Sequence, residues 1–242
     1  AALARWGKNG ASKSVKRKMH KVVSEKDRVK RLFADNNQGC KIDLGCGANK
    51  QPGWIGVDFR KEPGVDIVQD LSKFPWDQIP DESASIVMTS HLLEHINPDS
   101  PDPRLAGLLD LLRDKKVISK EEVEKYVGEY RFLGGFIRFM DEVWRILKPG
   151  GQFMNTFPMG GSPGYWQDPT HVNPITEVTM AYFDPLAKDP YGNVYNLYYI
   201  YRPKPWKIGP CAYQLNGFME VVLEKRRIDK SYKVSDNATM KS

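Results

Sequence analysis

Short apolar runs recur along the chain from residue 41, with turn-forming residues between them. The runs at 41–44, 54–57, 65–68 and 84–90 have the length and composition of β-strands. Apolar runs without polar alternation suit strands that are covered on both faces, which is typical of a parallel sheet flanked by helices. The pattern therefore predicts an α/β fold.

The chain then changes to helical spacing. Apolar residues recur every three or four positions over 136–147, which predicts a helix with one buried face. "KPGG" at 148–151 predicts the end of this helix and a following strand at 152–157, and 217–228 has the pattern of a last strand. Upstream, "SKEE" at 119–122 has the form of a capping box.

Two segments, 97–128 and 160–206, do not fit this alternation, and the second contains ten aromatic residues. Loops at the carboxyl ends of strands form binding sites in open α/β sheets, so we expect inserted lids or pocket walls here. Ordinary packing is the alternative, since aromatic side chains bury readily. We expect one domain over 32–242, preceded by an extension at 1–31.

The extension is strongly basic. Residues 1–31 hold eleven Lys or Arg against Glu25 and Asp27, a balance of +9 in a chain of net charge +6. Such a segment can contact nucleic acid or another anionic surface, or it can lie on the domain as an amphipathic helix. Both interpretations stay open at this stage.

Apolar runs and cysteines bear on the cellular location of the protein. In this chain of 242 residues no apolar run approaches the roughly 20 residues that a membrane span needs. Cys40, Cys46 and Cys211 form no CxxC pair, which fits a reducing compartment and not a cysteine zinc site. We expect a soluble, cytoplasmic protein without a membrane span.

The stretch "KIDLGCGANKQPGWIGVD" at 41–58 places a carboxylate on each side of a glycine turn. A dinucleotide site needs a third small residue where this chain has Lys50. Asp43 beside the turn would repel a pyrophosphate and attract a cation, and Asp58 at a strand end suits vicinal ribose hydroxyls. The stretch therefore predicts a positively charged nucleoside, and S-adenosylmethionine is one.

With these residues the chain resembles the class I S-adenosylmethionine-dependent methyltransferases, in particular small soluble members with a HxLEH segment, over roughly 39–158. The resemblance implies a Rossmann-like, doubly wound, mostly parallel seven-stranded sheet with a C-terminal antiparallel hairpin. It also implies a set of cofactor-binding positions. The methionine part would be cradled by Asp43, Gly45, Cys46 and Gly47, the ribose would be held by Asp58, the adenine by Asp70 and Leu71, and the cofactor would be bordered by Ser90 and His91.

The sequence departs from the family pattern after the first strand. Asn49 stands where a third glycine is frequent, and the link from Gly47 to Asp58 is short. We therefore expect the first helix to be brief or irregular. Lys50 is then a candidate partner for the methionine carboxylate.

"HLLEH" at 91–95 also fits the HxxEH pattern of inverted zinc proteases, in which two histidines on one helix face bind the metal. That interpretation needs His91 inside a helix and a third ligand. Because His91 directly follows a strand-like run, the sequence predicts no metal site.

A second polar group lies in "YWQDPTHVNPIT" at 165–176. His171 is the best candidate for a catalytic base, since a neutral imidazole suits proton acceptance near pH 7. A histidine that only fixes the loop is the alternative. Glu94 is a second catalytic candidate.

The methyl acceptor is predicted from the stretch that follows the fourth strand. The stretch after the fourth strand lacks the N/D-P-P-Y/F segment of base-amino methyltransferases, which favours an oxygen or nitrogen of a small-molecule or glycan-type acceptor. One alternative is an RNA or DNA methyltransferase guided by residues 1–31. Another is a non-catalytic nucleic-acid-binding or assembly protein on the same fold.

Overall fold

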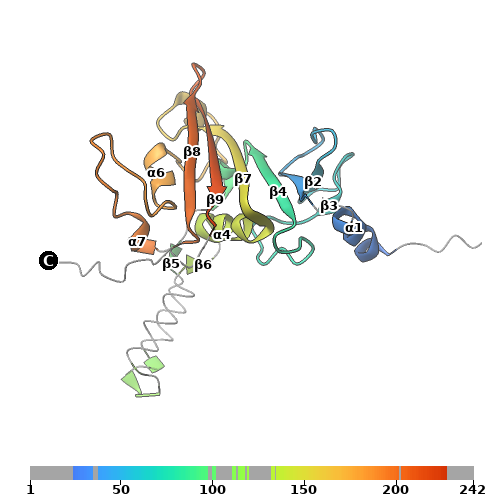
Figure 1. Cartoon of the computed structure of the whole chain (residues 1–242), viewed down its shortest axis with the longest axis horizontal. Coiled ribbons are helices and arrows are strands. Elements are labelled where there is room, and N and C mark those ends of the chain that lie inside the picture. The colour runs from blue at the N-terminus through green and yellow to red at the C-terminus, as the bar shows by residue number, and fades with distance from the viewer. Residues whose placement is uncertain are drawn as a thin grey trace, which may run out of the picture.

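The computed structural model describes residues 24–34, 38–97, 100–101, 111–112, 114–117, 119, 132–133, 135–201 and 203–227. Its centre is a seven-stranded sheet with the order β3-β2-β1-β4-β7-β9-β8 (Figure 1). The strands are β1 Cys40–Leu44, β2 Ile55–Asp58, β3 Ile67–Val68, β4 Ala84–Ser90, β7 Leu147–Pro158, β8 Trp206–Tyr213 and β9 Phe218–Lys225. A separate two-stranded pair is formed by β5 Ser100–Pro101 and β6 Phe132–Leu133.

Strand direction confirms the predicted fold class. Strand β1 pairs in parallel with both β2 and β4, and β4 pairs in parallel with β7. The hairpin of β8 and β9 then closes the sheet, with β9 antiparallel to β7. Because the strand order reverses between β1 and β4, ligands are expected outside the carboxyl ends of these strands.

Helix α4, Phe136–Ile146, follows the predicted apolar spacing and packs its apolar face into the core. Phe139 is fully buried and meets the buried Trp76 edge to face, with ring centroids 5.3 Å apart. The strand after this helix begins earlier than predicted. Leu147 already pairs with Ala84, and residues 148–151 lie inside β7 at a shift of register.

Helix α1, Glu25–Ala34, lies beside β2 and β3 in Figure 1 and buries Val29 in the core. The boundary expected after residue 31 falls inside this helix. Residues 25–34 thus form an amphipathic helix on the domain, while 1–23 lie outside the described residues.

The two predicted insertions differ in how much of them is described. Most of 97–128, including residues 120–122 of the expected capping box, lies outside the described residues. The segment 160–206 contains three short helices, α5 Pro163–Trp166, α6 Glu177–Ala181 and α7 Tyr198–Tyr201. None of the helices in the described part of the chain has the length and apolar character that crossing a bilayer requires.

Candidate functional site

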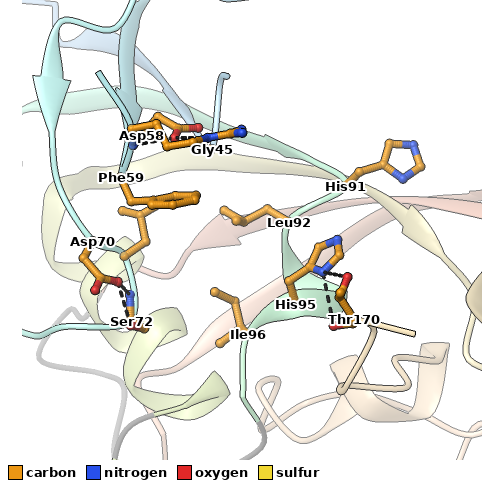
Figure 2. Close-up of a pocket in the computed structure, with 12 residues that line it drawn as sticks. Gly45, Asp58, Phe59, Asp70, Ser72, His91, Leu92, His95, Ile96 and Thr170 are labelled. Carbon is orange, nitrogen blue, oxygen red and sulfur yellow. Dashed lines mark hydrogen bonds and ion pairs between the residues drawn. The ribbon is translucent and has the colours of Figure 1, made fainter. Parts of the chain in front are cut away.

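A cavity of about 660 Å³ opens at the carboxyl ends of β1, β2 and β4. It is lined by Gly45, Asp58, Phe59, Arg60, Asp70, Leu71, Ser72, His91, Leu92, His95, Ile96 and Thr170. Figure 2 shows two groups of polar side chains across this space. The glycine-turn end is formed by Gly45, Asp58, Phe59, Asp70 and Ser72, and the histidine end by His91, His95 and Thr170.

The glycine turn follows β1 directly; residues 45–54, all of which the structure describes, form turns and irregular backbone without a regular helix. The backbone amides of Gly45 and Cys46 donate to the carbonyl of Val57, at 2.8 and 3.3 Å, which folds the turn against β2. Gly45 has φ +72°, and a Cβ there would lie 3.1 Å from the Leu92 side chain. Glycine is therefore required for both conformation and space.

Asp58 ends β2 and is only 4% exposed. Its Oδ2 accepts a hydrogen bond from the Gly47 amide at 2.9 Å, and its Oδ1 accepts one from the Arg60 amide, also at 2.9 Å. These bonds fix the carboxylate at the cavity wall and tie the glycine turn to the end of β2.

Asp70 and Phe59 continue this wall. Asp70 Oδ1 accepts hydrogen bonds from the Ser72 hydroxyl at 2.6 Å and from the Ser72 amide at 3.1 Å. The hydrogen bond from the Ser72 hydroxyl lowers the pKa of Asp70, which keeps it ionised. Figure 2 shows Phe59 between Asp58 and Asp70, and its side chain is 65% exposed.

Several residues expected to bind the cofactor are not among those that line the cavity. Asp43 is buried and accepts from the Gln51 amide at 3.3 Å, and burial raises its pKa. Gly47 contributes its amide to Asp58. Cys46 is buried, and burial raises the pKa of its thiol to about 11. Ser90 is exposed at the end of β4.

Lys50, the expected partner of the methionine carboxylate, pairs with another group. Its Nζ lies 2.8 Å from Asp66 Oδ2, an oxygen that also accepts a hydrogen bond from the Gly56 amide at 2.8 Å. The Lys50 charge is thus balanced within the protein, and its role as partner of the methionine carboxylate stays a prediction.

At the histidine end, the 3₁₀ helix η1, Leu93–His95, holds a buried acid. Glu94 is 0% exposed, and neither of its carboxylate oxygens has a hydrogen-bond partner. His91 Nδ1 lies 3.3 Å from Glu94 Oε1, and His171 Nε2 lies 4.0 Å from it. Burial raises the pKa of Glu94, an effect that the nearby histidines oppose.

His171 lies behind the cavity and does not line it. Its side chain is 8% exposed, and its Nδ1 lies 2.7 Å from the Tyr165 carbonyl. The His95 and His171 rings meet edge to face with centroids 4.7 Å apart, so His95 connects this residue to the cavity.

The helix geometry of inverted zinc proteases is not present at "HLLEH". His91 has φ +53° and precedes η1, which spans only three residues. His91 and His95 therefore do not share one helix face.

Four residues that line this cavity were not predicted as site residues from the sequence: Phe59, Leu92, Ile96 and Thr170. Phe59 could have been found from its position directly after Asp58 at a strand end. Thr170 belongs to the polar loop that was singled out for His171. Leu92 and Ile96 look like ordinary core residues, so their sequence pattern carries no signal of a ligand.

No family model matches the chain, and no curated protein matches it. Among solved structures it is similar to an S-adenosylmethionine-dependent methyltransferase from Aquifex aeolicus (11% identity, TM-score 0.43, 84% of this chain and 90% of that one). It is also similar to one from Archaeoglobus fulgidus (16%, 0.40, 84% and 95%). A third is a 16S rRNA (adenine(1408)-N(1))-methyltransferase from Catenulisporales acidiphilia (12%, 0.42, 84% and 92%). At such identities and scores these likenesses carry no argument about the site, and the fold assignment rests on the strand order itself.

Proposed function

We propose that this chain is an S-adenosylmethionine-dependent methyltransferase that acts on an oxygen or nitrogen of a small-molecule or glycan-type acceptor. The observation that carries the proposal is that Gly45, Asp58 and Asp70, from three different strand ends, line one cavity. This cavity lies where the strand order reverses, the usual ligand position in open α/β sheets. The resemblance assigns these three positions to the methionine, ribose and adenine parts of the cofactor.

The chemistry of the lining supports this ligand. An ionised carboxylate offers about four acceptor positions, of which the Gly47 and Arg60 amides use two on Asp58, so vicinal ribose hydroxyls can use the others. Phe59 and Leu71 offer apolar surface to an adenine ring, and Asp70 offers an acceptor to its exocyclic amine. The cavity volume of about 660 Å³ is typical of small-molecule sites.

Bound S-adenosylmethionine supplies a methyl group on a sulfonium. The protein then mainly has to orient the acceptor, and an acceptor hydroxyl also has to lose a proton. We assign proton acceptance to His171, with Glu94 as the second catalytic residue. Because a carbonyl can only accept, Nδ1 of His171 carries its hydrogen toward Tyr165, and Nε2 keeps the basic lone pair.

Calorimetry with S-adenosylhomocysteine tests the proposal, and NAD⁺ is the matched control ligand because it shares the adenosine part. We expect saturable one-to-one binding of S-adenosylhomocysteine and no binding of NAD⁺. Tighter binding of NAD⁺, or no binding of either ligand, would contradict the proposal.

The acceptor class is tested with methyl-labelled S-adenosylmethionine. We expect the label to enter a hydroxylated or amino small molecule or a glycan precursor. Label that enters only RNA or DNA would replace this acceptor by a nucleic acid, with residues 1–31 as the expected contact.

A further inference from the structure

We propose that Glu94, His95 and His171 bind one divalent transition-metal ion, of the zinc type, at the histidine end of the cavity. One potential ligand atom from each of these side chains lies within 4.8 Å of the others. Zinc bonds to nitrogen and oxygen are about 2.0–2.1 Å long, so tetrahedral ligand atoms lie about 3.3 Å apart. Side-chain rotations that close about 1.5 Å or less would therefore complete the site.

The buried carboxylate is the strongest argument for a cation. Glu94 is fully buried, and no hydrogen bond reaches either carboxylate oxygen. Buried polar atoms are almost always satisfied by protein, water or an ion, because burial without a partner is costly. A divalent cation would satisfy this carboxylate and balance its charge.

The hydrogen bonds of the two histidines also fit metal binding. His171 Nδ1 lies 2.7 Å from the Tyr165 carbonyl. His95 Nδ1 lies 3.3 Å from the Thr170 carbonyl and 3.2 Å from the Thr170 hydroxyl, which itself donates to Asp168 at 2.7 Å. Both Nδ1 atoms therefore face acceptors and carry the hydrogen, which leaves the lone pair on Nε2. Metal-binding histidines characteristically have this second hydrogen bond.

The two segments that carry the ligands are held together without a metal. The amides of Val172 and Asn173 donate to the Glu94 carbonyl at 2.9 and 3.0 Å, and the Asn173 side chain donates to the Leu93 carbonyl at 3.2 Å. His171, one residue before this contact, is thereby kept beside η1. This loop therefore supplies His171 as the third ligand beside Glu94 and His95.

An imidazolium is the competing partner for Glu94. His91 approaches it most closely, at 3.3 Å, but its side chain is 44% exposed and it is not part of the three-residue group. His91 is therefore the matched control. Three protein ligands leave a fourth position open, as in catalytic zinc sites. A bound ion would occupy the Nε2 lone pair of His171, so metal binding and proton acceptance are alternative states of this side chain, and only the metal-free state acts as the base of the proposed function. Metal binding itself does not rest on the proposed function.

The experiment titrates the metal-free chain of 242 residues with Zn²⁺ by calorimetry and with Co²⁺ by visible absorption. We expect one ion per chain and a cobalt spectrum of nitrogen and oxygen ligands without a thiolate band. His95→Ala and His171→Ala are expected to weaken binding at least about 100-fold, more than the loss of an outer partner does. His91→Ala is expected to bind within about twofold of wild type, since it removes no ligand.

Glu94→Gln keeps the shape of the side chain and removes its charge, so it tests the site if an alanine variant fails to fold. Its affinity for Zn²⁺ is expected to fall as much as that of His95→Ala and His171→Ala. The proposal is overturned if the wild-type protein binds neither ion, if the folded variants bind like wild type, or if His91→Ala loses as much as His95→Ala. Titration of the same samples with S-adenosylhomocysteine shows separately whether the proposed function fails.

Discussion

The two ends of the cavity differ in how their carboxylates are hydrogen-bonded. At the glycine-turn end, backbone amides hold both oxygens of Asp58, and Ser72 holds Asp70. At the histidine end, Glu94 is buried more deeply and no hydrogen bond reaches its carboxylate. The carboxylates at the glycine-turn end are thus hydrogen-bonded without a ligand and keep free acceptor positions. The carboxylate at the histidine end is buried, and only a proton or a cation can balance its charge.

If the two ends act separately, His171→Ala should give the largest effect, a loss of catalysis together with the loss of metal affinity described above, and it should leave the cofactor affinity unchanged. Loss of a general base slows turnover by about 10²–10⁴-fold. The affinity for S-adenosylhomocysteine should stay unchanged, because His171 does not line the glycine-turn end. Initial rates of label transfer to an acceptor that the wild type methylates, together with calorimetry, check this. Full activity would reject the catalytic role.

Asp58→Ala should produce the converse result. Loss of two hydrogen bonds to a charged group is expected to weaken S-adenosylhomocysteine about 100-fold or more, while Zn²⁺ affinity stays unchanged. Asp77→Ala, which removes an exposed carboxylate away from the cavity lining, is the control. Equal affinities of Asp58→Ala and wild type in calorimetry would remove the ribose assignment.

Phe59→Ala should have a smaller effect at the same end. Stacking of a base on an aromatic ring is worth about 1–3 kcal/mol, so the affinity for S-adenosylhomocysteine should fall about tenfold. Tyr191→Ala removes a ring that is 90% exposed and outside the cavity lining, and it should have no effect. If the two variants bind equally in calorimetry, adenine does not contact Phe59.

Ser72→Ala should give the smallest effect, visible only as a change in titration. Without the hydroxyl, the pKa of Asp70 should rise toward its ordinary value. A lowered carboxyl pKa stabilises the fold above the unfolded-state pKa, and this contribution is lost as the pH falls through the folded-state pKa. The variant should therefore lose slightly less stability on acidification. NMR titration of the Asp70 carboxyl checks the shift, and an unchanged pKa would contradict it.

The fold was predictable because local pattern determines it. Apolar runs gave the positions of β1, β2 and β4, and the spacing of three and four gave α4. The start of β7 was not predictable, because the glycines at 150 and 151 have the pattern of a turn. In the structure they lie inside the strand, where the pairing with β4 shifts its register.

The candidate site also has a part that was predictable from local sequence and a part that was not. Asp58 and Gly45 belong to one short stretch whose residues meet across adjacent strands. The group of Glu94 and His171 depends on a loop 77 positions away, held to η1 by backbone hydrogen bonds that no residue pattern encodes. For the same reason the sequence predicted no metal site there.

The most direct measurement of the central claim is a crystal structure of the chain with S-adenosylhomocysteine. The account predicts ribose hydroxyls within hydrogen-bond distance of the Asp58 carboxylate, the adenine beside Phe59 and Asp70, and the sulfur directed toward the histidine end. A nucleoside bound elsewhere, or turned so that its ribose contacts neither carboxylate, would contradict it.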